Sequence, residues 1–375
     1  MNKQQIHLGS IFNIPIGLDY SWFLIFALIT WSLATGYFPS EFKTWPVAEY
    51  WIIGAVTSIL FFGSVLLHEL GHSVIALYYK VPVRSISLFI FGGIAQIGSE
   101  PPSAAAEFWI AIAGPLVSFI LAGLFAVLRF VVTGVAPFLA LTQYLAYING
   151  VLGLFNLFPG FPLDGGRVFR AIVWRITHNF QRATRIAATV GRGIAFLFIG
   201  WGVWQIFAGN LFNGLWIVFI GWFLESAANG QLAQQHLHAL LEGHTVVQAM
   251  SQNYVLIPAD LTLQQLADEH ILGSGRRFFI VEQLDQPIGL LTILNLNKIP
   301  RADWSTTTAA QAMTPVDQFH LLKSDVALSE AFEEMSLQGV DQLPVVSDGQ
   351  VKGILSRESV VNFLRNLQEL NRSRL

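Results

Sequence analysis

Residues 50–72, YWIIGAVTSILFFGSVLLHELGH, join an apolar run to a metal-binding pattern. Tyr50–Leu67 contains no charged residue and is nearly as long as a helix must be to cross a bilayer. The last five residues fit H-E-x-x-H, in which the two histidines lie on one face of a helix. We therefore expect a membrane helix that directs His68 and His72 at one metal ion, with Glu69 placed to accept a proton from a water. A structural His–Glu pair that faces a helix bundle is the alternative.

Other apolar stretches on both sides of this helix bring the number of expected membrane spans to six. Residues 20–40 and 193–224 contain no Asp, Glu, Lys or Arg. The spans are expected at Tyr20–Thr35, Tyr50–Leu67, Phe108–Leu128, within 130–163, and twice within 193–224, where Gly209 and Asn210 offer a turn between two short helices. So many long apolar runs argue against buried core helices of a soluble protein.

The composition changes near residue 230. Residues 1–230 carry 19 of the 45 charged side chains and ten of the eleven tryptophans, whereas the remainder resembles a soluble domain. We expect a membrane core at 1–230, a linker at 231–242 and a soluble part from residue 243. His236 and His238 in the linker are expected on a solvated helix rather than at a metal site. The net charge of −3 without a basic cluster argues against a nucleic-acid partner.

Arginine residues between the fourth and fifth spans predict the orientation of the chain. Six arginines and no acidic residue occur between Gly165 and Leu224. Positively charged loops stay on the cytoplasmic side, so this loop and both termini are expected in the cytoplasm, with the spans in the cell (inner) membrane. The first 18 residues are polar or mixed, and no cleavable signal peptide is expected. The arginines are Arg167, Arg170, Arg175, Arg182, Arg185 and Arg192.

A catalytic zinc site commonly has three protein ligands and one open position. The chain has no cysteine, so the ligands must be histidines and carboxylates. Asp164 is the first histidine, aspartate or glutamate after the start of the apolar stretch at residue 130. It follows prolines and glycines that break the helix, which allows its carboxylate to approach the metal. An ordinary residue at the membrane boundary is the alternative. Glu107 is the rival ligand, although an exposed or capping role suits a position at the start of a span.

Two further features bear on how a substrate would be held. Asn156, one or two turns before the helix break, either holds substrate backbone or a developing oxyanion, or makes a helix–helix hydrogen bond. Residues 84–98 are too short to span a bilayer, and two β-prone stretches flank Gly92 and Gly93. They predict a β-hairpin, which must be shielded by protein or line a wet cavity because an open sheet edge is costly in lipid.

The H-E-x-x-H motif together with the downstream N-x-x-P-x-x-P-L-D-G segment resembles the site-2 protease family of intramembrane metalloproteases. Gly92-Gly93-Ile94 and Ala113-Gly114-Pro115 also resemble that family, and the resemblance covers about residues 1–230. It implies cleavage of a transmembrane substrate helix and a hairpin at Gly92 and Gly93 that binds substrate as an added strand. It also implies one zinc ion per chain, with the ligands His68, His72 and Asp164 and the general base Glu69.

The soluble part contains a repeat, at residues 244–300 and 307–366. Thr245–Met250 matches Thr308–Met313, and similar matches follow at offsets of 63 to 65 residues. Each copy alternates short β-rich runs with helices, such as the one expected at Leu263–Leu272. The pattern predicts a small α/β module used twice.

The pair resembles tandem cystathionine-β-synthase-type (CBS) domains, at about 243–300 and 301–367, before a tail at 368–375. Such pairs often bind an adenine nucleotide between the repeats, and the resemblance implies contacts from Thr292 and Ser356. Asn295 and Ser359 stand where nucleotide-binding members have an aspartate for a ribose hydroxyl, which argues against a nucleotide. A homodimerisation or docking module is the alternative.

The expected fold is a six-helix membrane domain with a re-entrant hairpin, followed by a cytoplasmic α/β tandem CBS domain. The expected function is an intramembrane zinc endopeptidase, with a transmembrane protein substrate and lipid as partners and the CBS pair as a regulator. A CBS-gated transporter or channel and an inactive membrane scaffold are the alternatives. The spans show no inverted repeat of the kind common in transporters.

Overall fold

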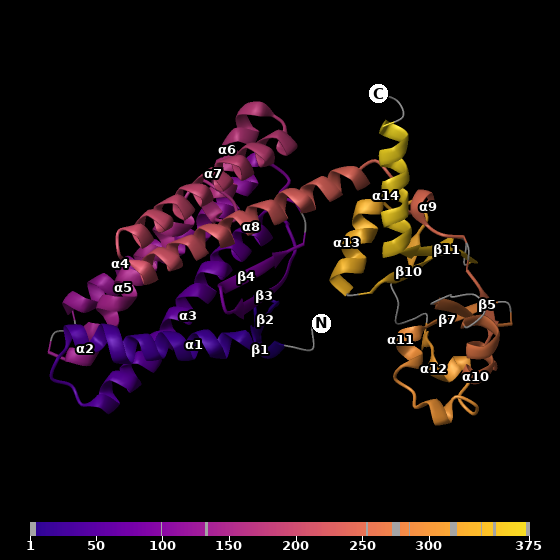
Figure 1. The fold of residues 1–375 in the computed structure, drawn as a ribbon, viewed down its shortest axis with the longest axis horizontal. Helices are drawn as coiled ribbons and strands as arrows, with labels where there is room; N and C mark the ends of the chain where they lie inside the picture. Colours follow the sequence, from indigo (N-terminus) through magenta and orange to yellow (C-terminus); the bar gives the residue numbers. More distant parts are fainter. Residues whose placement is uncertain are drawn as a thin grey trace. The chain divides into compact units, whose positions relative to one another are not determined.

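The computed structural model describes residues 5–372 except 99, 132–133, 253, 272–277, 285, 316–320, 339 and 348–349. The chain divides into two compact units, of which one ends at Gln235 and the other begins at His236 (Figure 1).

Within the described residues, six helices are long and apolar enough to cross a bilayer, which confirms the expected number of spans. The first span, Ser21–Glu41, combines α1 (Ser21–Ser32), a π-helical turn (Leu33–Tyr37) and α2 (Phe38–Glu41). The others are α3 (Val47–Tyr78), α4 (Ala104–Val131), α5 (Ala136–Asn156), α7 (Phe180–Phe207) and the first part of α8 (Leu211–Leu241).

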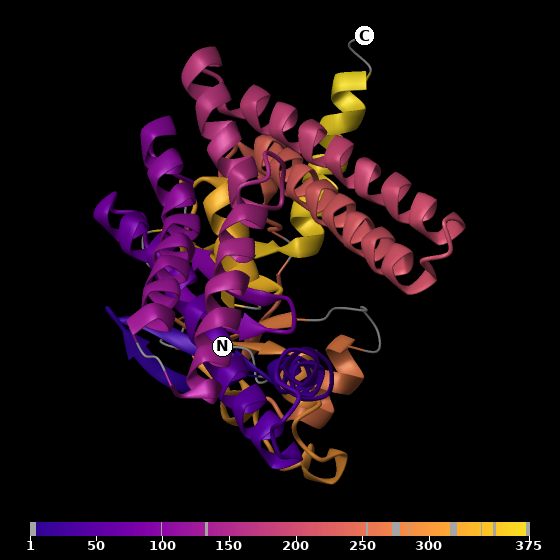
Figure 2. The same ribbon diagram turned by 90° about the vertical axis from the view of Figure 1, so that its left-hand side faces the viewer.

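The last two spans are longer than expected. The turn between them does lie at Gly209, which has a φ of 92° in the left-handed region. Figure 2 shows α7 and α8 as an antiparallel pair joined there. A Cβ on Gly202 would lie only 2.7 Å from the carbonyl oxygen of Gly214, so the two helices pack closely through small residues.

The expectation of two short helices within 193–224 was wrong, and so was the idea of an arginine-rich loop. The arginine-rich stretch is helical, because it forms α6 (Asp164–Thr177) and the first turns of α7. Arg182, Arg185 and Arg192 lie on the exposed side of α7. Long arginine side chains can carry their charge to the membrane surface while the helix continues.

The expected hairpin is part of a larger sheet. β3 (Val83–Phe89) and β4 (Gly92–Ile97) pair antiparallel. β3 also pairs in parallel with β2 (Ile14–Asp19), which pairs antiparallel with β1 (Gln5–Ile11). The order is β1-β2-β3-β4, so β4 is an edge strand. The sheet lies at one end of the membrane helices (Figure 1).

Residues 5–19 were not expected to form strands. They do so because their alternating side chains have a partner surface in the folded unit. Ile14 of β2 and Ile86 of β3 are buried against Leu70 of α3, and all three lie in one apolar cluster. The sheet is therefore fixed to the part of α3 that carries the metal-binding pattern.

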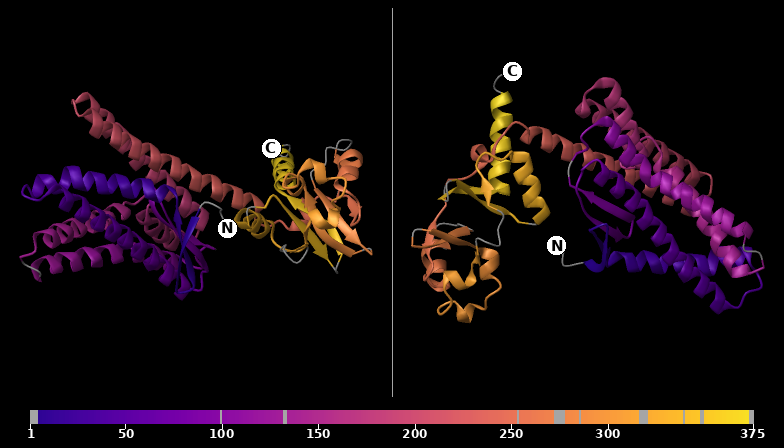
Figure 3. Two further views of the ribbon diagram at one scale, coloured as in Figure 1. Left: turned by 90° about the horizontal axis from the view of Figure 1, so that it is seen from below. Right: turned by 180° about the vertical axis from the view of Figure 1, so that it is seen from behind.

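The second unit contains two sheets of the same design, drawn in Figure 3. Each sheet has a parallel pair followed by an antiparallel hairpin, which confirms the repeat. The first sheet has the order β5 (Leu256–Pro258), β6 (Phe278–Gln283), β7 (Gln286–Thr292) and β8 (Thr314–Pro315). The second has the order β11 (Gln350–Ser356), β10 (Gln342–Ser347) and β9 (Leu322–Lys323).

Short helices accompany these sheets. They are α9 (Val246–Ala249), α10 (Leu263–Leu266) with a π-helical turn (Ala267–Ile271), α11 (Ile293–Leu296), a 3₁₀ turn (Arg301–Asp303), α12 (Ala309–Ala312), α13 (Leu328–Gln338) and α14 (Arg357–Arg372). The matching Thr245 and Thr308 each form a capping box with the glutamine three residues later, at the start of α9 and α12. This local hydrogen bonding explains why the two sequences agree at these positions.

The two repeats interlock. Val246 and Ala249 of α9 belong to the apolar core of the second sheet, whereas Ala309 and Ala312 of α12 belong to the core of the first. The first helix of each repeat thus completes the core of the other repeat.

Candidate metal centre

The helix α3 brings the two histidines together. It begins after Pro46 and ends just before Lys80, which has a φ of 61° in the left-handed region. The rise of one turn places the rings of His68 and His72 with their centroids 4.9 Å apart and their Nε2 atoms 3.2 Å apart. Each histidine is only 4% exposed, so both imidazoles are held inside the helix bundle.

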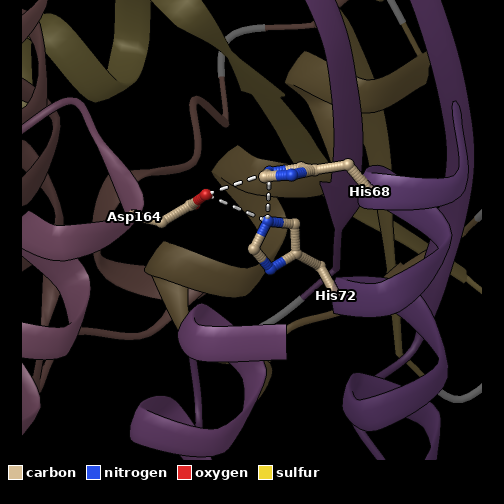
Figure 4. Close-up of side chains that lie close together, drawn as sticks. All are labelled: His68, His72 and Asp164. Carbon is tan, nitrogen blue, oxygen red and sulfur yellow. Dashed lines mark hydrogen bonds and ion pairs between the residues drawn. The ribbon is translucent and has the colours of Figure 1, made fainter. Parts of the chain in front are cut away.

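Asp164 joins the two histidines from the other side (Figure 4). Its Oδ2 lies 3.1 Å from Nε2 of His68 and 3.2 Å from Nε2 of His72. Asp164 is the first residue of α6, and the turn before it packs tightly on the two glycines that follow. A Cβ on Gly165 would lie 2.2 Å from the carbonyl oxygen of Leu157. The glycines therefore let the chain turn back and present the carboxylate at the histidines.

The helix α4 orients both rings through their other nitrogen. Nδ1 of His72 donates to the carbonyl oxygen of Ile110 at 2.7 Å. A carbonyl can only accept, so the proton of a neutral His72 ring resides on Nδ1, and Nε2 keeps a lone pair for a metal. Nδ1 of His68 lies 2.8 Å from Oγ of Ser118. The carbonyl of Ile110 thus fixes the tautomer of His72, whereas the hydroxyl of Ser118, which can donate or accept, holds the ring plane of His68.

Gly114, also on α4, keeps the space beside these nitrogens open. A Cβ at this position would lie 2.2 Å from Nε2 of His72 and 2.6 Å from Nε2 of His68. Any other residue would place its side chain against the Nε2 atoms of both histidines.

The donor set fits a zinc ion. Within the described part of the chain, one group of three histidine, cysteine, aspartate or glutamate residues has ligand atoms that all lie within 4.8 Å of one another. The group is His68, His72 and Asp164. Two imidazoles and one carboxylate leave the fourth tetrahedral position of zinc open, as in catalytic sites.

Glu69 lies beside the cluster and against the sheet. Its Oε2 accepts a hydrogen bond of 3.1 Å from the backbone N–H of Ala95 on β4. A Cβ on Gly93 would lie 2.6 Å from Cγ of Glu69, so this glycine lets the strand approach the carboxylate. Gly92 begins β4 with a φ of 123° in the left-handed region. The expected substrate-binding glycines thus lie on the strand next to the expected base.

Glu107, the rival ligand, lies outside the cluster. It is fully buried and forms an ion pair with Arg170 of α6, in which Nε of Arg170 lies 2.6 Å from Oε1 of Glu107. The expectation of an exposed or capping role was wrong. The partner lies 63 residues away in the chain, so the local sequence gave no indication of it.

Asn156 is the last residue of α5 and is half-buried. Among the described residues its amide has no hydrogen-bond partner, so the helix–helix bond, one of the two alternatives, is not observed. Asn149 makes such a bond instead, from Nδ2 to Oγ of Ser64 on α3 at 3.2 Å. Sequence reasoning missed Asn149 and Ser118. A signal for Ser118 was its spacing of one helical turn from Gly114.

In the second unit, the residues expected to contact a nucleotide cap helices. Oγ1 of Thr292 donates to Oδ1 of Asn295 at 2.5 Å, and the N–H of Asn295 donates back to Oγ1 at 3.4 Å. Likewise, the N–H groups of Ser359 and Ser356 each donate to the other's Oγ at 3.0 Å. Asn295 and Ser359 stand where nucleotide-binding CBS domains have an aspartate, and here they form hydrogen bonds with the residue three positions earlier. The side chains of His236 and His238 lie outside the described residues.

A cavity of about 210 Å³ lies between β7 and the β10–β11 hairpin. Eight of its nine lining residues have apolar or no side chains, and Gln286 is the exception. Neither Thr292 nor Ser356 lines it. The full set is Ile280, Gln286, Pro287, Gly289, Leu290, Leu321, Pro344, Val346 and Val351.

Comparison with known proteins identifies the family. The profile of peptidase family M50 matches residues 56–137 and 133–199, and the CBS-domain profile matches 309–366. A Synechocystis sp. protein named as a zinc metalloprotease is 36% identical over 374 residues, which cover 97% of this chain and 96% of the relative. A similarly named Mycobacterium tuberculosis protein, Rip3, is 33% identical over 367 residues, which cover 96% and 93%.

A solved structure also matches the chain. The site-2 protease from Methanocaldococcus jannaschii is 31% identical, and the match covers 61% of this chain and 95% of that chain with a TM-score of 0.42. The long alignments with the two relatives span both units, including the H-E-x-x-H helix and the CBS pair. On the evidence of the family profile and of these two relatives, the chain belongs to peptidase family M50 and is a multi-pass membrane zinc metalloprotease of the site-2 protease type.

Proposed function

We propose that this protein is an intramembrane zinc endopeptidase that cuts membrane-spanning segments of substrate proteins. One zinc ion per chain binds to His68, His72 and Asp164. The observation that carries the proposal is the meeting of two buried imidazole nitrogens and one carboxylate oxygen, all within 4.8 Å, inside a bundle of membrane helices. Ionisable groups at such positions are costly and are usually retained for function.

The chemistry divides between the metal and the neighbouring glutamate. Zinc held by His68, His72 and Asp164 would lower the pKa of a water and polarise the scissile carbonyl. Glu69 accepts the proton of the attacking water and then gives it to the leaving amide nitrogen. The N–H of Ala95 holds one carboxylate oxygen of Glu69, which leaves the other oxygen to face the reaction.

Substrate would reach this site in extended form along β4. A helical segment satisfies its own backbone hydrogen bonds, so it must unwind before a peptide bond is exposed to attack. β4 is an edge strand, and the N–H of Ala95 reaches Glu69 from it, so the open edge lies at the base. A substrate strand added there regains backbone hydrogen bonds along the edge that Gly92 and Gly93 begin. Asn156, which has no partner among the described residues, holds substrate backbone or the developing oxyanion.

The CBS pair regulates entry to the site from the cytoplasmic side. The helix α8 begins in the last span and continues to Leu241 without a break. One helix therefore joins the membrane unit to the second unit. A regulatory ligand acts only by its different affinities for the open and closed states. Family membership removes the support for a transporter or channel, and the complete set of His68, Glu69, His72 and Asp164 speaks against an inactive scaffold.

Purified protein in lipid vesicles, mixed with tagged single-span substrates, tests the proposal. We expect cleavage that a zinc chelator stops and that added zinc restores, with about one zinc ion per chain by metal analysis. His72→Ala and Asp164→Ala should lose cleavage and should bind zinc far more weakly, so that metal analysis finds clearly less zinc in both variants. His178→Asn is the matched control, because His178 is exposed at the end of α6, and asparagine tolerates its left-handed backbone. Cleavage that survives complete removal of zinc would refute the proposal.

The regulatory part needs its own experiment. Removal of residues 243–375 should change the cleavage rate while the zinc content stays the same. An unchanged rate would leave the CBS pair as a docking or assembly module.

A further inference from the structure

One face of α4 supports the whole candidate site. Ser118, Gly114 and Ile110 follow one another at helical spacing, and they contact or leave room for the two histidines as described above. Glu107 continues the same row, three residues before Ile110, and is 0% exposed. Its partner Arg170 belongs to α6, the helix that begins with Asp164. The row on α4 therefore contacts both histidines and, through Glu107, the helix of the third ligand.

Arg170 is held on several sides. Two of its nitrogens, Nε and Nη2, donate to Oε1 of Glu107. The guanidinium carbon lies 5.0 Å from the ring centre of Phe161 and 4.7 Å from that of Phe180. Nη1 lies 3.5 Å from Oγ1 of Thr184 on α7. The side chain thus ties α6 to α4, to α7 and to the turn that precedes Asp164.

Glu107 faces two arginines of α6, because it hydrogen-bonds to Arg170 and the buried Arg167 also interacts with it electrostatically. Its Oε2 is buried and has no hydrogen-bond partner among the described residues. A carboxylate away from water needs a counter-charge, so the position of Arg170, and with it the rotation of α6 about its axis, is strongly determined.

We propose that Glu107 and Arg170 are positioning residues, which fix α6 so that the carboxylate of Asp164 stays at the nitrogens of His68 and His72. The inference rests on the proposed zinc site, because it assigns the pair an effect on metal affinity. Arg170 lies six positions after Asp164 on the same helix, so a small rotation of α6 moves the carboxylate out of reach of a metal that demands a ligand near 2.0–2.2 Å. Neither residue belongs to the group of candidate metal ligands.

The zinc dissociation constant of the full-length protein in detergent is the decisive measurement. Glu107→Gln keeps the shape but removes the charge, and Arg170→Lys keeps the charge but removes the two-nitrogen contact. We expect each to weaken zinc binding by about 10- to 100-fold, the range for lost partners of metal ligands. Thr30→Val is the matched control. It removes a buried hydrogen bond of 3.1 Å between α1 and α3, to Ser58, in the same unit.

A double-mutant cycle separates positioning from a general loss of stability. If the pair acts through Asp164, Glu107→Gln should have no further effect in a protein that already carries Asp164→Ala. The zinc dissociation constants of the Asp164→Ala protein and of the double variant should then agree within about twofold. The absorption spectrum of bound cobalt gives a second readout, and Glu107→Gln should shift it toward that of Asp164→Ala. Should Glu107→Gln fail to fold, Glu107→Asp keeps the charge and draws the carboxylate back by one methylene.

The outcomes distinguish this inference from the proposed function. Wild-type zinc affinity in the folded Glu107 and Arg170 variants would overturn the positioning role, even with a lower melting temperature. Full additivity with Asp164→Ala would overturn it too. Absence of zinc from the wild-type protein, or wild-type affinity in the His72→Ala variant, would instead overturn the metal site itself.

Discussion

Gly114→Ala offers the sharpest test of the metal centre. The added methyl carbon would lie 2.2 Å from Nε2 of His72 and 2.6 Å from Nε2 of His68. A bound zinc would itself lie about 2.0–2.1 Å from each nitrogen, so methyl and metal compete for the same small volume. Relief of the clash requires a shift of about 1 Å, because carbon packs against other heavy atoms at about 3.5 Å or more.

Neither the helix α4 nor the histidine rings can move by this distance without the loss of a contact. If α4 moves, it strains the contacts of 2.7 Å from Ile110 to His72 and 2.8 Å from Ser118 to His68. If the rings move, they leave the carboxylate of Asp164. We therefore expect zinc binding to weaken by more than about 100-fold. A factor of 100 corresponds to about 2.7 kcal/mol and is the largest effect typical for loss of one hydrogen-bond partner of a metal ligand.

The assay compares zinc content and cleavage rate with those of Gly123→Ala. Gly123 lies on the same helix, and a Cβ there would meet no atom within 4 Å. This control should keep zinc and activity, and it gains helix propensity of up to about 1 kcal/mol. Full zinc occupancy and normal cleavage in Gly114→Ala would refute the geometry assigned to the site.

Three further predictions concern the base, the CBS pair and the orientation. Glu69→Gln should abolish cleavage but keep one zinc per chain, since glutamine cannot take a proton, and substantial residual proteolysis would exclude this base. Calorimetry on the full-length protein should show no adenine-nucleotide binding at micromolar concentration, because the hydroxyls of Thr292 and Ser356 cap helices; a saturable signal lost in Thr292→Ala would contradict this. Cysteines that replace Arg175 and Gln350 should resist an impermeant thiol reagent in intact cells, and labelling of either from outside would reverse the proposed topology.

The sequence by itself was sufficient for the family and the architecture. Hydropathy predicts spans because the bilayer acts on each helix separately, and H-E-x-x-H places His68 and His72 on one face because helix geometry is local. The CBS repeat was visible because its threonine caps and hairpins also form from neighbouring residues. The number of spans, the hairpin and the family were confirmed. The metal ligation by Asp164 and the role of Asn156 stay predictions.

Tertiary structure decided what depends on residues far apart in the chain. It brought Asp164 to the histidines across 96 residues, and it paired Glu107 with Arg170, which reversed the expectation of an exposed carboxylate. It also made strands of residues 5–19, which have weak local signals but a partner in β3. Such contacts form only after helices and sheet pack together, because each buried polar group must then find its counterpart among the surfaces that meet it.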